Sequence, residues 1–210
     1  MSDQENGGLP PLIIARKKVV GAQGLRVYKH VEQSEEHKEI VAILCPDGLM
    51  LMPSRGYDEV FPGIFISDLY SAKNLDFIKA LGFTHVLNCC EGPGINQCVT
   101  GLIFYSETCV VNYLGLQLND SETQSITECF ALANTFINSC LHAQGKILVH
   151  CREGFSRSST IVLAYLMSTG MQLKLAVKQL RDHREIGPND GFISQLIEYN
   201  KRLFCLPQFE

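Results

Sequence analysis

The 210-residue chain has 46% hydrophobic and 19% charged residues, a balance that is typical of globular proteins and excludes an intrinsically disordered chain. Its net charge of −4 at pH 7 argues against nucleic acid as its main partner. No apolar run is long enough to cross a bilayer, and the first residues lack the regions of a signal peptide, so we expect neither a membrane partner nor secretion.

The cysteines indicate a reducing compartment. The chain has nine of them, an odd number, and none follows the Cys-x-x-Cys spacing of zinc sites. Neither a disulfide framework nor a metal site is therefore predicted. We expect a cytoplasmic or nuclear protein that needs no metal ion or other cofactor.

The composition divides the chain into three parts. The first residues are polar and rich in glycine and proline, so we expect residues 1–33 to be a partly disordered extension. Residues 34–205 are expected to form one domain, and residues 206–210 a short tail.

The extension contains one candidate motif. Arg16, Lys17 and Lys18 precede Leu25 and Val27, a pattern that resembles the docking motifs that bind mitogen-activated protein kinases. Such patterns also recur by chance. The alternative is a short arm packed on the domain, with its basic residues in solvent.

Hydrophobic periodicity predicts helices that alternate with short strands. Ser34 can cap the first helix, residues 35–44, whose first turn is acidic. Further helices are predicted over residues 71–81, 125–141, 173–183 and 190–204, and strands over residues 64–66, 84–89, 110–118 and 147–149. This alternation predicts a single α/β domain with a central, mostly parallel sheet flanked by helices on both faces.

The stretch from Lys146 to Leu166 combines a buried strand, a short loop and a buried helix. Backbone N–H groups and the helix dipole converge in such a loop, so it forms an anion site. A thiol placed there, Cys151, is expected to have a lowered pKa, and the planar fork of Arg157 fits two phosphate oxygens. The combination predicts cysteine-based cleavage of phosphate esters.

Two motifs carry a resemblance to a known family. The sequence His-Cys-x-x-Gly-x-x-Arg-Ser at residues 150–158 matches the signature of the protein tyrosine phosphatase superfamily. Together with Arg-Glu-Ile-Gly-Pro-Asn-Asp-Gly-Phe at residues 184–192, it resembles the VHR-type atypical dual-specificity phosphatases. The resemblance implies a protein tyrosine phosphatase-like fold. It also implies hydrolysis of phosphotyrosine and phosphothreonine or phosphoserine in proteins, through a phosphocysteine intermediate.

The resemblance implies roles for individual side chains. Cys151 is the nucleophile, Arg157 binds the phosphate oxygens, and Asp120 is the general acid. On the residues alone, Asp120 could equally be a turn residue. Ser158 caps the helix and donates a hydrogen bond to the sulfur, and His150 orders the loop through a backbone hydrogen bond.

Five further loop residues are expected to surround the substrate: Arg152, Glu153, Gly154, Phe155 and Ser156. An acid at Glu153 disfavours polyanionic inositol lipids, and Phe155 offers an aromatic wall where relatives carry tyrosine. Gly154 is expected to let the backbone approach the phosphate. Arg184 corresponds to an arginine that holds a second phosphate in VHR-type enzymes; the alternative is a charge at a helix C-terminus.

Two functions remain as alternatives to an active protein phosphatase. One is a module that binds phosphoproteins without cleaving them, against which the presence of Cys151, Arg157 and Asp120 counts heavily. The other is a phosphatase of a nonprotein ester, which Glu153 and the acidic composition disfavour. Phosphorylated proteins are the expected partners.

Cys89 and Cys90 end a predicted strand, at a place that resembles the position of a redox-active cysteine in a related phosphatase. A thiolate at Cys151 would be prone to oxidation, and a nearby thiol could trap it as a disulfide. The alternative is that both cysteines pack in the sheet as ordinary core residues.

Overall fold

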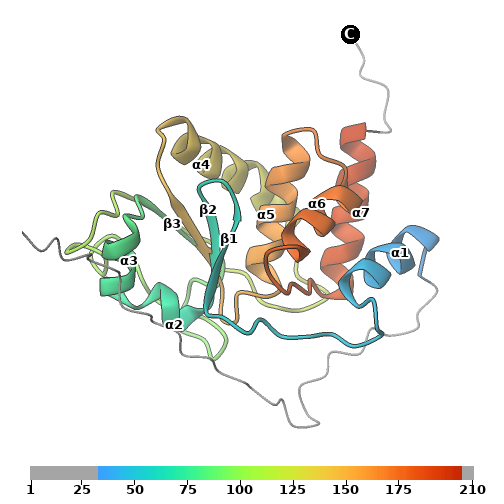
Figure 1. The fold of residues 1–210 in the computed structure, drawn as a ribbon, viewed down its shortest axis with the longest axis horizontal. Coiled ribbons are helices and arrows are strands. Elements are labelled where there is room, and N and C mark those ends of the chain that lie inside the picture. The colour runs from blue at the N-terminus through green and yellow to red at the C-terminus, as the bar shows by residue number, and fades with distance from the viewer. Residues whose placement is uncertain (1–32, 205–210) are drawn as a thin grey trace, which may run out of the picture.

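A computed structural model describes residues 33–204 and shows a sheet with helices on both sides (Figure 1). The five-stranded sheet has the order β1-β2-β5-β3-β4, with β1 antiparallel to β2 and all other neighbours parallel. The predicted single α/β domain with a mostly parallel sheet is confirmed. The strands are β1 (Tyr57–Phe61), β2 (Ile64–Ser67), β3 (His85–Asn88), β4 (Asn112–Gly115) and β5 (Ile147–His150).

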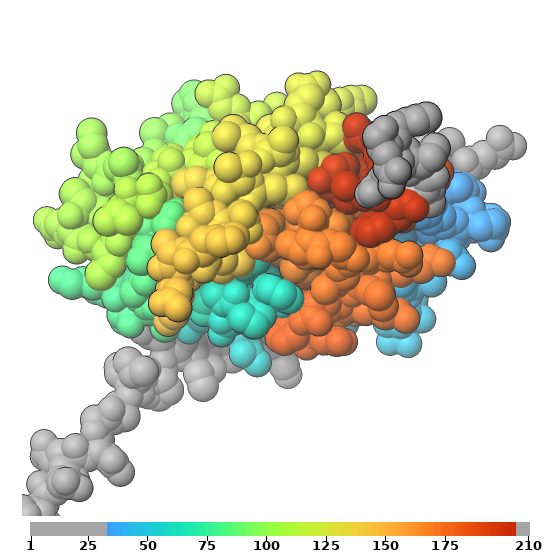
Figure 2. Space-filling view, turned by 90° about the horizontal axis from the view of Figure 1, so that it is seen from above, coloured from blue at the N-terminus to red at the C-terminus, as the bar shows by residue number. Residues whose placement is uncertain are grey.

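The helices lie in two groups, one on each face of the sheet. Figure 2 shows the α1 and α7 ends of the chain side by side, with the residues between β3 and β4 at the opposite end of the molecule. One group is α2 (Leu69–Ala72) and α3 (Leu75–Leu81); the other is α1 (Glu35–Leu44), α4 (Phe130–His142), α5 (Arg157–Ser168), α6 (Leu173–Arg181) and α7 (Asp190–Phe204).

The central strand β5 contributes to both hydrophobic cores. Ile147 and Val149 pack in the larger core with α1 and α4 to α7, whereas Leu148 packs in the smaller core with α2 and α3. This division follows from the alternation of side chains along a strand. Since β5 lies between β2 and β3, the loop that leaves its carboxyl end starts at the centre of the sheet, where α/β proteins bind ligands.

Polar caps decide where several helices begin. Ser34 accepts a hydrogen bond from the N–H of His37 at 3.2 Å, so α1 begins as predicted. The predicted helix over residues 71–81 is instead two helices. Asp68 caps α2 and Asn74 caps α3, each accepting from the N–H three residues on, at 2.7 and 3.1 Å.

Two strands differ from the expectation. The first, β1, was not predicted, because its charged and half-buried residues lack an apolar pattern; its place at the sheet edge accounts for that composition. The other, β4, covers only four residues of the predicted 110–118. A 3₁₀ turn, η1 (Thr127–Cys129), replaces the start of the helix predicted from residue 125.

Within residues 33–204, no helix combines the length and apolar character that crossing a bilayer requires. No group of histidine, cysteine and acidic side chains in this range is arranged to hold a metal ion, and its cysteines form no disulfide. The candidate docking motif over residues 16–27 lies outside the described residues.

Candidate active site

The loop over residues 151–156 joins β5 to α5 and contains the predicted site. Within it, Gly154 has a φ of 62°, and a Cβ there would lie 2.5 Å from the carbonyl of Ser67 and 2.7 Å from Arg184. Glycine is needed because both the backbone conformation and the space exclude a side chain. The close neighbours are Ser67 and Arg184, and the predicted approach of this backbone to a phosphate stays a prediction.

Cys151 is buried at the start of this loop, with 2% of its surface exposed. Burial alone would raise the pKa of its thiol, but the Arg157 guanidinium and hydrogen bonds from Ser158 and the Phe155 N–H lower the pKa below its ordinary value. Ser158 Oγ lies 3.3 Å from Cys151 Sγ. The site therefore favours a thiolate, and a hydroxyl faces it.

Arg157 begins α5 and is almost fully buried, at 2% exposure. Its Nη1 donates to the carbonyls of Asn96 and Leu118, at 2.9 and 3.1 Å. Its Nε is buried and has no hydrogen-bond partner among the described residues. A buried guanidinium with an unused donor, beside a helix N-terminus and a low-pKa thiol, fits an oxyanion such as phosphate.

Asp120 follows β4 and reaches the same loop. Its Oδ1 accepts hydrogen bonds from Ser156 Oγ at 2.8 Å and from Asn189 Nδ2 at 2.9 Å. Ser156 is buried and its hydroxyl contacts the carboxylate, and its predicted place at the substrate stays a prediction. Asn189 was missed as a site residue, although it belongs to the second sequence motif.

His150 is predicted to order the loop through a backbone hydrogen bond, and its ring interacts with the backbone of Cys151. Both ring nitrogens are buried without a partner of hydrogen-bond geometry among the described residues. Burial lowers the pKa of this imidazole to about 4, and the neighbouring backbone of Cys151 acts in the opposite direction. His150 is therefore neutral and buried beside the loop, and its predicted ordering role stays a prediction.

Arg184 lies behind the loop of Cys151. Its side chain is 0% exposed and pairs with Asp58, from Nη1 to Oδ2, at 2.6 Å. Its Nε donates to the carbonyl of Gly154 at 2.8 Å. These contacts hold the guanidinium against the back of the loop, and the predicted role of Arg184 in binding a second phosphate stays a prediction.

The remaining loop residues lie at different depths. Arg152 and Glu153 are partly exposed at the rim, with their charged groups 3.6 Å apart, and Arg152 also donates to the carbonyl of Ile95. Phe155 is 5% exposed and packs on Gly187, where a Cβ would lie 2.3 Å from its ring. Arg152 and Glu153 can meet a substrate, whereas Phe155 mainly packs on the chain before α7.

Cys89 and Cys90 follow β3 and are both fully buried. The N–H of Cys89 donates to the carbonyl of His150 at 2.7 Å, which places it beside the strand that leads to Cys151. Burial first, and then the negative charge of Cys151, raise the pKa of both thiols, that of Cys90 to about 12. Both are thus protonated neighbours of the candidate nucleophile.

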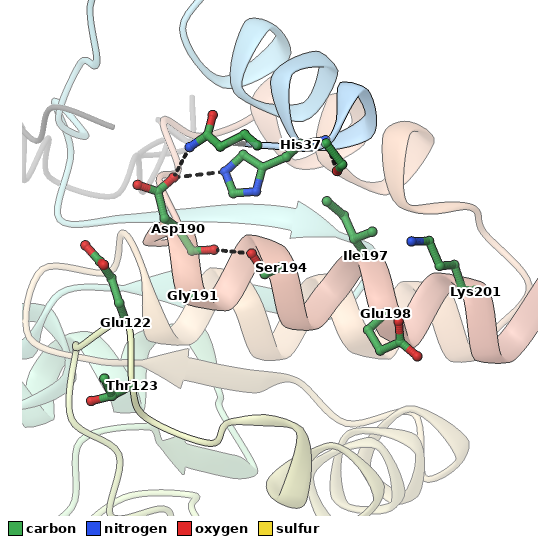
Figure 3. Close-up of a pocket in the computed structure, with 11 residues that line it drawn as sticks. His37, Glu122, Thr123, Asp190, Gly191, Ser194, Ile197, Glu198 and Lys201 are labelled. Carbon is green, nitrogen blue, oxygen red and sulfur yellow. Dashed lines mark hydrogen bonds and ion pairs between the residues drawn. The ribbon is translucent and has the colours of Figure 1, made fainter. Parts of the chain in front are cut away.

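A cleft of about 550 Å³ lies next to the loop that carries Asp120 (Figure 3). α1 and α7 form its walls, and Glu122 and Thr123 come from that loop. His37 Nε2 lies 2.9 Å from the carboxylate of Asp190 at its edge. None of the residues at the thiol lines this cleft, so it flanks the candidate active site.

Comparison with known proteins agrees with this geometry. The model of the family described as the dual specificity phosphatase catalytic domain matches residues 64–202. Human dual specificity protein phosphatase 26 is 41% identical over 150 residues, which cover 70% of this chain and 68% of that protein.

Solved structures show the same fold. The crystal structure of human DUSP28 gives a TM-score of 0.61 at 24% identity, over 73% of this chain and 99% of that one. The human tyrosine phosphatase-like serine/threonine/tyrosine-interacting protein gives a TM-score of 0.58 at 30% identity, over 72% of this chain and 100% of that one. The chain belongs to the atypical dual-specificity protein phosphatases of the cysteine-based protein tyrosine phosphatase superfamily.

Proposed function

We propose that this protein phosphatase hydrolyses phosphotyrosine and phosphothreonine or phosphoserine through a phosphocysteine intermediate. The proposal is supported above all by one arrangement: a buried thiol with a lowered pKa, at the N-terminus of α5, beside the guanidinium of Arg157. Asp120, on a neighbouring loop, supplies a carboxyl group that its hydrogen bond with Ser156 holds at this site.

The first step forms the intermediate. The thiolate of Cys151 attacks phosphorus, and the bond between phosphorus and the ester oxygen breaks while Asp120 gives its proton to that oxygen. Arg157 holds the nonbridging oxygens as charge shifts onto them. The products of this step are the free alcohol or phenol and a phosphocysteine.

The second step restores the enzyme. Asp120, now a carboxylate, takes a proton from water, whose oxygen attacks phosphorus and breaks the bond between phosphorus and sulfur. The sulfur leaves as a thiolate, and Ser158 Oγ, at 3.3 Å, is placed to donate a hydrogen bond to it. Inorganic phosphate is released.

Phosphorylated proteins are the proposed substrates. Glu153 is 44% exposed in its side chain at the rim, where its charge would repel a polyanionic lipid headgroup. Mitogen-activated protein kinases remain a proposal that depends on residues 16–27. The phosphoprotein-binding module remains the second candidate, because one similar structure is named as a phosphatase-like interacting protein.

Hydrolysis of para-nitrophenyl phosphate in the presence of EDTA tests the proposal. We expect vanadate-sensitive activity that Cys151→Ser abolishes and that Asp120→Ala lowers, with a larger loss, of about 100-fold or more, on phosphoserine and phosphothreonine peptides than on this ester. Wild-type protein with a reduced thiol and no activity on this ester or on phosphopeptides would favour the binding module, and capture of phosphopeptides would then be measured.

A further inference from the structure

Arg184 connects three segments behind the loop of Cys151. Its Nε donates to the carbonyl of Gly154 at 2.8 Å, and its Nη1 donates to the carboxylate of Asp58, in β1, at 2.6 Å. It also contacts the carbonyls of Arg55 and Glu153, at 3.2 and 3.5 Å. These partners together hold the guanidinium against the back of the loop.

One peptide group links Arg184 to Cys151. The carbonyl of the peptide between Gly154 and Phe155 accepts from Arg184, and the N–H of the same peptide, on Phe155, donates to Cys151. A trans peptide is planar, so its C=O and N–H point in opposite directions, and the described chain has no cis peptide. Fixing the carbonyl at Arg184 therefore aims the N–H at the sulfur.

We propose that Arg184 and Asp58 are a positioning pair that turns the peptide between Gly154 and Phe155 so that its N–H faces Cys151. This inference rests on the proposed thiolate chemistry of Cys151. Asp58 fixes the guanidinium from β1, and Arg184 passes that constraint to the loop. A site held by a second layer of hydrogen bonds keeps its geometry better than one held by its own loop alone.

The charged groups around Arg184 also support the positioning pair. Burial lowers the pKa of Arg184, while Asp58 first, and then Cys151 and Asp68, raise it. A buried arginine without such a partner would be costly, so Asp58 allows the charge to stay behind the loop. The other groups that act on Cys151 are Arg157 and Ser158, and the thiols Cys89 and Cys90 lie near it in neutral form.

The rate at which iodoacetamide alkylates Cys151, measured at a series of pH values, gives the pKa of this thiol and tests the pair. Mass spectrometry of the peptide that contains Cys151 follows the modification. We expect Arg184→Met to raise the pKa of Cys151 by about one unit, the effect of losing one hydrogen bond to a charged group. The acid limb of kcat/KM should shift upward with it. At a pH below both pKa values we expect kcat/KM to fall by about 10-fold, the full effect of a one-unit shift.

Two variants keep the test decisive. Asp58→Asn retains an acceptor for Arg184 without its charge, and we expect a smaller shift in the same direction; this variant decides if Arg184→Met does not fold. Arg181→Met is the control, because Arg181 pairs with Glu185 near the same end of α6 and does not contact the loop. We expect it to leave the pKa of Cys151 unchanged.

The outcomes separate this inference from the proposed function. Folded Arg184→Met and Asp58→Asn proteins with the wild-type pKa of Cys151 would overturn the positioning pair while leaving hydrolysis intact. A shifted alkylation pKa in these two variants, together with a wild-type protein that hydrolyses no phosphate ester, would uphold the pair and reject the proposed function.

Discussion

Ser156 donates a hydrogen bond of 2.8 Å to the carboxylate of Asp120 and so joins the loop of the proposed nucleophile to the loop of the proposed general acid. Asn189 donates to the same oxygen at 2.9 Å. Two donors on one oxygen fix the carboxyl group relative to Cys151, which general acid catalysis requires.

Removing both donors should expose this role. We expect the double variant of Ser156→Ala and Asn189→Ala to hydrolyse phosphoserine and phosphothreonine peptides about 10-fold to 100-fold more slowly. The loss on para-nitrophenyl phosphate should be smaller, because its phenolate leaves without much help from a proton. Steady-state kinetics on both substrates measure the difference. Ser194→Ala, at an exposed serine of α7, is the control. Equal losses would show that the two donors only stabilise the fold.

Ser158→Ala tests the hydroxyl that faces the sulfur. Loss of a hydrogen bond to the thiolate should raise the pKa of Cys151, so activity should disappear at a higher pH as the solution is acidified. The second step should also slow, because the sulfur leaves without a donor. A burst of phenol release in rapid mixing, larger than in wild type, would reveal the accumulated intermediate; an unchanged acid limb and no burst would contradict the role.

Gly154→Ala should destabilise the domain by about 1–3 kcal/mol or more, because the new methyl group would meet the Ser67 carbonyl in a strained backbone region. Gly82→Ala is the matched control: its φ of 68° is similar, but nothing lies within 4 Å of its Cβ. Thermal unfolding should show a larger loss for Gly154→Ala. Equal losses would attribute the whole effect to backbone strain.

His150 makes stability depend on pH. Its pKa in the folded protein, about 4, lies below the ordinary 6.5, so the unfolded chain binds a proton first as the pH falls. This contribution is complete above pH 6.5 and is lost progressively toward pH 4. Denaturant unfolding at pH 7.5 and pH 5 should show a smaller loss of stability in His150→Asn than in wild type. The same loss in both proteins would assign the pH dependence to other groups.

The redox hypothesis for Cys89 and Cys90 can be tested in the same protein. Mild peroxide followed by peptide mapping should reveal a disulfide between Cys151 and one of the two, since all three are buried neighbours. Replacing that partner by serine should make inactivation irreversible. Cys140→Ser, a buried cysteine of α4, is the control. Absence of any Cys151 disulfide would leave the packing interpretation.

The sequence predicted the parts of the site that lie within one segment. The strand, loop and helix around Cys151 are local, and their apolar runs, cap and motif spacing indicate the fold of that segment directly. Asp120 was found through the family resemblance, and its contact with Ser156 agrees with that placement.

Contacts between distant segments were not predictable in the same way. The ion pair of Arg184 with Asp58 joins residues in α6's trailing turn and an edge strand that the sequence did not reveal. Asn189 stands in a recognised motif, but a motif does not state which side chain it contacts. The split of α2 from α3 was missed because Asn74 reads equally well as a helical surface residue.

The burial of α5 has a consequence for the motions of the enzyme. Every residue from Arg157 to Met167 is buried, so the helix that orients the phosphate site is also the centre of the core. Its backbone amides should exchange with deuterium only when the whole domain opens, far more slowly than those of the exposed chain over residues 93–96. Substrate selection can therefore change in the surface loops without disturbing the backbone of the helix that orients the phosphate site.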